Sequence, residues 1–188
     1  MAKLVVFNSI TLDGFFTDQN GDMSWAHKAR EDAEWNQFVA GNASGGGRLL
    51  FGRITYQLMA SYWPTPQAQV NAPIVAEQMN ALPKVVFSRT LEEASWQNTV
   101  LVRGDPAAEV RKMKAESDKD MVILGSGSIV SQLAQVGLID EFQMVLNPIA
   151  LGRGRTMFET VDHRLDMRLT RTRAFGNGNV FLCYEPVG

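Results

Sequence analysis

The chain has 188 residues, of which 45% are hydrophobic, and a formal net charge of −2. This length is enough to bury a core without disulfides or metals, so residues 1–188 are expected to form a single domain. Charges of both signs are interspersed, without the basic stripe that nucleic-acid binding requires, so nucleic acid is not expected as a partner. Cys183 is the one cysteine, which excludes an internal disulfide framework.

No segment has the apolar length of a membrane span, and the apolar stretch after Met1 is too short for a secretory signal. We therefore expect a cytoplasmic protein that does not enter a membrane. His27 and His163 are far apart in sequence, and neither lies near Cys183, so no metal site is predicted. A serine-hydrolase elbow of the form Gly-x-Ser-x-Gly is also missing from the sequence.

Short apolar runs alternate with segments of helical periodicity along most of the chain. Strands are predicted at 4–10, 49–51, 85–87, 99–102, 121–124 and 142–149. Helices are predicted at 31–39, after Gly52, at 74–82, from Asp105-Pro106 onward, and at 128–136 with Gly137 as a left-handed cap. Residues 41–47 and 60–72 are predicted to be surface loops. The alternation favours a mostly parallel sheet covered by helices on both faces.

The pattern changes near the C-terminus. Leu165, Met167 and Leu169 alternate with polar residues, and a Gly-Asn-Gly-Asn sequence at 176–179 separates them from the apolar run 180–184. This arrangement predicts a β-hairpin. From the residues alone we expect an α/β sheet of about six parallel strands, finished by an antiparallel pair at its C-terminal edge.

A Gly-Ser-Gly-Ser turn at 125–128 lies where a buried strand gives way to a helical pattern. Gly125, Ser126, Gly127 and Ser128 allow a backbone to approach a phosphate closely, and the helix start adds its N–H groups and its positive end. The competing interpretation is a tight turn that needs glycine only for its geometry. The position is therefore a candidate anion site.

Two further strand ends carry an arginine. Gly52 and Arg53 follow one strand, with Thr55 able to cap the next helix, and Ser88 and Arg89 follow another. Either arginine alone would more often be a solvated surface residue. Together, at the carboxyl ends of parallel strands, they favour a phosphate-bearing ligand, and a dinucleotide is the natural candidate.

The order of these motifs resembles the dihydrofolate-reductase-like superfamily, in particular the branch named after the C-terminal reductase domain of the riboflavin-biosynthesis deaminase/reductase. The resemblance covers nearly the whole chain. It rests on segments 9–14, 50–56, 86–89, 123–127, 137–141 and 148–154, together with Trp25. It implies a three-layer sandwich whose mostly parallel eight-stranded sheet has an antiparallel C-terminal strand and helices on both faces, with NADPH as cofactor and a substrate cleft beside the nicotinamide.

Carried over onto this sequence, the resemblance assigns Gly52, Arg53 and Thr55 to the phosphates of NADPH. It assigns Ser88 and Arg89 to the adenosine 2′-phosphate and 125–128 to the pyrophosphate. The folate enzymes have two successive glycines in this last motif, whereas Ser126 takes the second position here. This difference leaves the local peptide geometry open.

The substrate side depends on acids near the first strand. Asp32 stands three positions before Trp35, as does the acid that holds the pterin ring in some folate reductases, and a buried carboxylate there can support protonation of a ring nitrogen. The simpler interpretation of Asp32 is an early-helix carboxylate. Asp13, in an Asp-Gly turn, is the competing acid, and Trp25 is the aromatic candidate for a loop that closes over substrate. Core packing is the alternative for Trp25.

These residues predict an NADPH-dependent reductase of a pteridine, an aminopyrimidine or a related small heterocycle, with Asp32 as the catalytic acid. Two alternatives remain. One is a non-catalytic NADP(H)-binding sensor or interaction module of the same fold, and the other is an α/β domain whose glycines only make turns. A homodimer is also expected, with 180–184 and the loop 152–154 as its surface.

Overall fold

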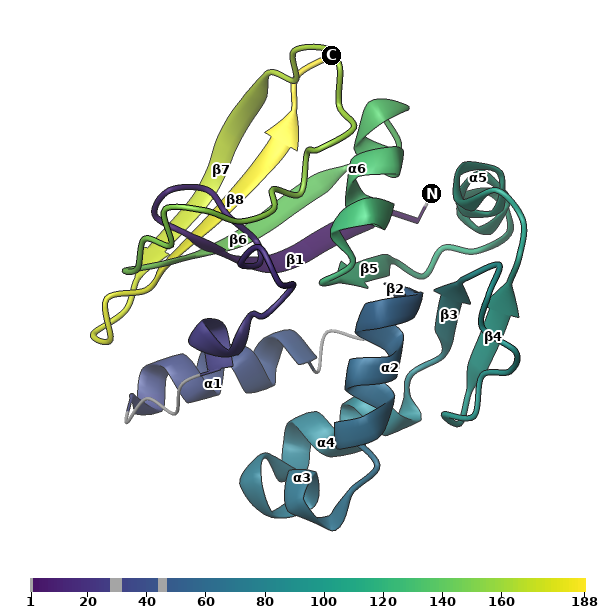
Figure 1. Cartoon of the computed structure of the whole chain (residues 1–188), viewed down its shortest axis with the longest axis horizontal. Coiled ribbons are helices and arrows are strands. Elements are labelled where there is room, and N and C mark those ends of the chain that lie inside the picture. Colours follow the sequence, from purple (N-terminus) through teal and green to yellow (C-terminus); the bar gives the residue numbers. More distant parts are fainter. Residues whose placement is uncertain (1, 28–31, 44–46) are drawn as a thin grey trace.

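The computed structural model describes residues 2–27, 32–43 and 47–188. Its centre is an eight-stranded sheet in the order β4-β3-β2-β5-β1-β6-β8-β7 (Figure 1). The first six of these strands are mutually parallel, whereas β8 is antiparallel to both of its neighbours. The strands are β1 (Leu4–Thr11), β2 (Arg48–Gly52), β3 (Lys84–Phe87), β4 (Thr99–Val102), β5 (Met121–Leu124), β6 (Glu141–Asn147), β7 (Met167–Ala174) and β8 (Val180–Pro186).

Within the described ranges, six α-helices and one short 3₁₀ helix connect these strands. They are η1 (Ser24–His27), α1 (Ala33–Ala43), α2 (Arg53–Tyr62), α3 (Pro66–Asn71), α4 (Pro73–Ala81), α5 (Pro106–Glu116) and α6 (Gly127–Gln135). The predicted cap of α5 is confirmed, because the Asp105 carboxylate accepts the N–H groups of Ala107 and Ala108. Gly137, the predicted left-handed cap after α6, has φ of +65°.

The helices form a layer on each face of the sheet. On one face, Val110 of α5 and Leu133 of α6 pack with Leu4, Leu50 and other strand residues in the largest buried cluster. Neighbouring strand residues point to the opposite face because side chains alternate along a strand. There, α2 and α4 cover β2 and β3, while α1 packs over the ends of β6 and β8. The fold is the expected three-layer sandwich.

The predicted loop at 60–72 is wrong. α2 continues to Tyr62, and α3 follows it, because Pro66 stands at the first helical position and the Thr65 hydroxyl accepts the N–H of Ala68. The predicted loop at 41–47 is also partly wrong, since α1 runs to Ala43; residues 44–46 lie outside the described part. The sixth predicted strand ends at Asn147 rather than at 149.

The predicted C-terminal hairpin is confirmed by the antiparallel pairing of β7 with β8. β8 lies between β6 and β7, and Phe181 and Cys183 within it are buried. The apolar run 180–184 is therefore an interior strand of the sheet, and only Val180, Leu182 and Tyr184 within it keep partial exposure. A homodimer, with 180–184 and the loop 152–154 as its surface, stays a prediction.

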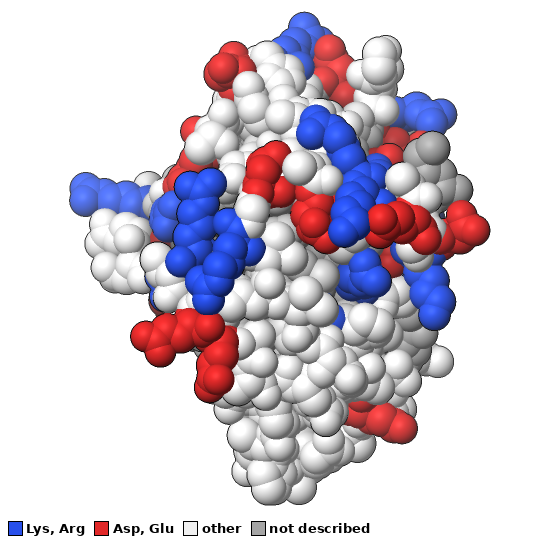
Figure 2. Space-filling view, turned by 90° about the vertical axis from the view of Figure 1, so that its right-hand side faces the viewer, with Lys and Arg blue, Asp and Glu red and all other residues white. Residues whose placement is uncertain are grey.

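Charged side chains are unevenly spread over the face in Figure 2. The upper part mixes acidic and basic residues, while the lower part, which holds α2 to α4, is nearly uncharged. In the sequence, Glu77 is the one charged residue between Ile54 and Pro83. This face carries no continuous basic stripe. None of the helices in the described ranges is both long and apolar enough to cross a membrane.

Candidate functional site

The site lies where two neighbouring parallel strands are followed by helices on opposite faces of the sheet. β2 leads into α2 on one face, and β5, which pairs with β2, leads into α6 on the other. Such a divergence opens a crevice at the carboxyl edge of an α/β sheet, where ligands bind. The N-termini of both helices border this crevice.

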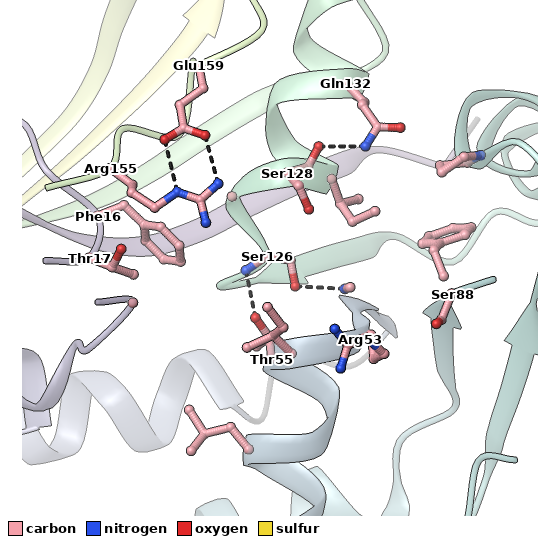
Figure 3. Close-up of a pocket in the computed structure, with 18 of the residues that line it drawn as sticks. Phe16, Thr17, Arg53, Thr55, Ser88, Ser126, Ser128, Gln132, Arg155 and Glu159 are labelled. Carbon is pink, nitrogen blue, oxygen red and sulfur yellow. Dashed lines mark hydrogen bonds and ion pairs between the residues drawn. The ribbon is translucent and has the colours of Figure 1, made fainter. Parts of the chain in front are cut away.

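A cavity of about 540 Å³ occupies the crevice (Figure 3). Segments far apart in the chain line it, from the loop after β1 to the connection between β6 and β7. Of the predicted cofactor residues, eight line this one cavity: Gly52, Arg53, Thr55, Ser88, Arg89, Ser126, Gly127 and Ser128. Gly125, the ninth, is not among the lining residues but directly precedes Ser126 in the chain. The three predicted phosphate-binding junctions therefore meet in space.

Ser126 joins the two helix starts. Its hydroxyl accepts the N–H of Gly52 at 2.9 Å and donates to the carbonyl of Leu124 at 3.0 Å. Its own N–H donates to the Thr55 hydroxyl at 2.9 Å. The Ser126 hydroxyl thus has both of its roles filled within the protein, so it shapes the crevice rather than offering a free hydroxyl to a ligand.

The turn requires an unusual backbone, which settles the peptide geometry that the sequence left open. Gly125 and Ser126 both have φ of +58°. A Cβ added at Gly125 would lie 2.8 Å from Cγ2 of Thr55, so the position needs glycine for space as well as for conformation. The left-handed Ser126 is held by its three hydrogen bonds.

The start of α6 presents unused donors to the cavity. The first N–H groups of a helix have no partner within the helix. In the described part of the chain, no acceptor is found for the N–H of Gly127 or of Ser128. Both residues line the cavity, so these donors and the positive helix end offer what an anion site requires.

Charge in the cavity favours an anion as well. Its lining contains three arginines, Arg53, Arg89 and Arg155, and one acid, Glu159. Arg155 donates through Nε and Nη2 to both carboxylate oxygens of Glu159, at 3.0 and 2.9 Å. The hydrogen bonds of this pair raise the pKa of Arg155 and lower the pKa of Glu159. No described acid pairs with Arg53 or Arg89.

Apolar side chains also line the cavity, among them Phe16, Met23 and Leu58. Phe16 belongs to a loop that is tied to the β6–β7 connection by a short antiparallel bridge between Thr17 and Arg155. This contact needs Gly154, because any Cβ there would overlap the carbonyl oxygen of Thr17. A flat, partly apolar ring can therefore pack beside the anion site.

The predicted substrate residues do not line the cavity. The exposed Asp13 carboxylate accepts the hydroxyl of Thr11 and the N–H groups of Leu151 and Gly152. These hydrogen bonds, that of Thr11 foremost, lower the pKa of Asp13. Asp13 therefore ties the loop after β1 to the loop after β6.

Asp32 and Trp25 also have local roles in the fold. Asp32 caps α1 by accepting the N–H of Trp35 at 2.9 Å, and its second oxygen accepts the N–H of Asn177 at 3.0 Å. Trp25 is 6% exposed in η1, and its indole N–H has no partner in the described structure. Functional roles for Asp13, Trp25 and Asp32 stay predictions.

Sequence analysis missed several lining residues, among them Phe16, Gln132, Arg155 and Glu159. The segment that carries Arg155 directly follows the Gly-Arg-Gly loop at 152–154, which was interpreted as part of a family motif and as a dimer surface but not as part of the site. No strand or helix period marks 155–159, so only folding brings it to the crevice. Of the two histidines, His163 is exposed beside Asp162, and the described residues contain no cluster that could hold a metal.

Comparison with known families now places the chain. The model of the RibD C-terminal domain family matches residues 2–181. The chain belongs to the RibD C-terminal domain family. This confirms the resemblance drawn from the motifs, and the family includes reductases.

Individual relatives agree with this placement. The uncharacterized protein YyaP of Bacillus subtilis (strain 168) is 28% identical over 183 residues, which cover 97% of this chain and 94% of YyaP. The structure of a putative riboflavin biosynthesis protein from Shewanella sp. PV-4 superposes with a TM-score of 0.79 at 21% identity, covering 100% of both chains. Dihydrofolate reductase from Enterococcus faecalis, complexed with NADP(H), gives a TM-score of 0.65 at 12% identity, covering 99% of this chain and 97% of that one.

Proposed function

We propose that this protein is an NADPH-dependent reductase that transfers hydride to a pteridine, an aminopyrimidine or a related nitrogen heterocycle. One observation carries the proposal: three strand ends place two guanidinium groups and two open N–H groups on a single cavity at the carboxyl edge of the sheet. Membership of a reductase-containing family and a fold shared with an NADP(H)-bound dihydrofolate reductase support it.

The residues present fit the cofactor. The N–H groups of Gly127 and Ser128 would hold the pyrophosphate, Arg53 would neutralise its charge, and Ser88 with Arg89 would hold the 2′-phosphate. The cavity has the size of typical small-molecule sites, which is about 300–1,000 Å³. Bound there, NADPH would supply the hydride.

The remaining chemistry falls to the chain itself. Reduction of a C=N bond by hydride also needs one proton on nitrogen, and a carboxylate hydrogen-bonded to the ring raises the affinity of that ring for a proton. Asp32 is proposed for this role. Two N–H groups occupy part of its acceptor capacity, and an ionised carboxylate has about four acceptor sites, so a ring N–H can still be accepted. Phe16, Met23 and Leu58 would exclude water from the ring.

The non-catalytic alternative has one observation in its favour. None of the three substrate-side candidates, Asp13, Trp25 and Asp32, lines the cavity, and both carboxylates are engaged by backbone N–H groups. A protein that binds NADP(H) through the same crevice without turnover is therefore the second candidate function.

Two measurements separate these functions. Fluorescence titration with NADPH and NADH measures cofactor binding, and a screen of NADPH consumption over pterins, folates and aminopyrimidine ribose derivatives measures turnover. The reductase proposal expects tight NADPH binding and oxidation with at least one heterocycle. Binding without oxidation by any member of the screen supports the sensor, whereas failure to bind either dinucleotide contradicts both functions.

A further inference from the structure

A third arginine lines the cavity in addition to the two that the sequence pointed to. Arg155 comes from the β6–β7 connection, and its backbone is fixed by hydrogen bonds with Phe16 and Thr17 of the loop after β1. Its carbonyl accepts the N–H of Phe16 at 2.8 Å, and its N–H donates to the carbonyl of Thr17 at 3.0 Å. The side chain is therefore anchored at the wall of the cavity rather than on a freely moving loop.

The guanidinium of Arg155 has donors to spare. The pair with Glu159 uses Nε and one hydrogen of Nη2, which leaves three of the five N–H donors of an arginine. Both partners are accessible, with 55% of the Arg155 side chain and 40% of the Glu159 side chain exposed. Exposed ion pairs contribute little stability, so a multiply charged anion can compete with Glu159 for this guanidinium.

The position of Arg155 in the cavity indicates which group of a bound dinucleotide it would contact. Figure 3 shows its guanidinium between Glu159 and the ring of Phe16, on the side of the cavity away from Ser88. A Cβ at Gly127 would lie 3.1 Å from that same ring, so Phe16 also touches the start of α6. Arg155 and the start of α6 are thus both neighbours of Phe16, on the side of the cavity away from Ser88.

We propose that Arg155 is a ligand of the pyrophosphate group and that Glu159 restrains it, so that Glu159 sets the affinity of the cavity for a diphosphate. The inference deepens the proposed function and rests on it for the identity of the dinucleotide. In the absence of ligand, the carboxylate of Glu159 satisfies the guanidinium. A bound diphosphate takes over part of that role.

The test uses Arg155→Met, Glu159→Gln and the double variant, each titrated with NADPH, NADH and inorganic pyrophosphate. Arg155→Met is expected to weaken NADPH and NADH by the same factor, about 10-fold, because both carry the pyrophosphate and the bond is charge-assisted. Glu159→Gln is expected to strengthen both, by about 3-fold, because it releases Arg155 from an exposed pair. In the Arg155→Met background, Glu159→Gln is expected to have no effect.

Arg168 and Glu185 provide a matched control. They form an exposed pair at 3.0 Å on the edge of the sheet, outside the cavity lining. Arg168→Met and Glu185→Gln should leave all three affinities unchanged. Unchanged affinities in Arg155→Met, or a loss confined to NADPH, would overturn the inference, as would weaker binding in Glu159→Gln.

The pyrophosphate titration separates this inference from the proposed function. If the unmodified protein binds neither dinucleotide, the proposed function fails, and Arg155 is then judged by pyrophosphate alone. Loss of pyrophosphate binding in Arg155→Met supports the inference in that case. Pyrophosphate binding that Arg155→Met leaves intact, or the absence of any pyrophosphate binding, overturns it.

Discussion

The two halves of the carboxyl edge use their polar groups in opposite ways. Around β2, β3 and β5, Arg53, Arg89 and the first N–H groups of α6 line a cavity. No described acid pairs with either arginine, although Arg53 donates to the Gln57 side chain, and no described acceptor pairs with the N–H groups of Gly127 and Ser128. Around β1, β6 and β8, the carboxylates of Asp13 and Asp32 are already engaged by backbone N–H groups. The first half is prepared for a ligand, while the second ties loops together. The comparison therefore supports cofactor binding more strongly than it supports any particular substrate.

A change in the turn at Gly125 and Ser126 should have the largest effect on the part of the edge around β2, β3 and β5. Gly125→Ala places a Cβ against Thr55 and strains a residue at φ of +58°, so we expect the free energy of unfolding to fall by about 2–4 kcal/mol. Cofactor binding should weaken with it, since Thr55 and Ser126 lose their arrangement. Denaturant unfolding and NADPH titration measure both. Gly104→Ala is the control, because it also lines the cavity but has no atom within 4 Å of the added Cβ; an equal loss in both variants would contradict the explanation.

Asp32→Asn tests whether the part of the edge around β1, β6 and β8 contributes to catalysis in addition to holding loops together. If Asp32 supports protonation of the ring, turnover should fall by about 100-fold or more, while the dissociation constant of NADPH stays within about 2-fold. Steady-state kinetics with the best heterocycle of the screen, over a range of pH, gives the first value and titration the second. Asp13→Asn is the control and should retain turnover. Full activity in Asp32→Asn would leave Asp32 with only its structural role.

Arg89→Met sharpens the assignment within the first half. Because NADH lacks the 2′-phosphate, we expect this change to weaken NADPH by about 10-fold and to leave NADH unchanged. Arg53→Met should instead weaken both dinucleotides, since it is assigned to phosphates that both contain. Titration of both variants with NADPH and with NADH distinguishes the two assignments. Equal losses for both dinucleotides in Arg89→Met would contradict the 2′-phosphate assignment.

Lys84, a cation outside the cavity, allows a smaller test, which concerns the pH dependence of the free energy of unfolding. Unlike the cavity arginines, it is buried, and its ammonium donates to the carbonyls of Asn80, Leu82 and Gln97. Burial lowers its pKa from 10.5 to about 8. Between these values the unfolded chain binds more protons, so the free energy of unfolding should rise with pH, by at most about 1.4 kcal/mol per pH unit.

Lys84→Met should lack this rise, whatever its stability at neutral pH. Unfolding curves at several values between pH 8 and pH 10 measure the slope in both proteins. Identical slopes would show that Lys84 titrates alike in the folded and unfolded states.

Short sequence patterns predicted most of the strands and helices, and they predicted the lining residues at the strand ends but not those of the β6–β7 connection. The strand and helix periods located every strand of the sheet, and the Asp105-Pro106 and Gly137 signals placed helix ends, because these depend on nearest neighbours along the chain. The loop predicted at 60–72 failed because α3 is a short helix with a weak apolar pattern, set by Thr65 and Pro66. The meeting of the predicted cofactor residues at one cavity was predictable because they lie at or just after strand ends, and parallel strand ends meet at one edge.

The sequence by itself determined the layered α/β architecture, the family and most of the polar residues that surround the crevice, since periodicity and turn chemistry are properties of short segments. Only the tertiary structure decided what those residues do to one another. It showed that the Ser126 hydroxyl is used within the protein, that Asp13 and Asp32 hold loops, and that Arg155 and Glu159 enter the cavity from a distant connection. Each of these depends on contacts between segments remote in sequence, which no local pattern encodes.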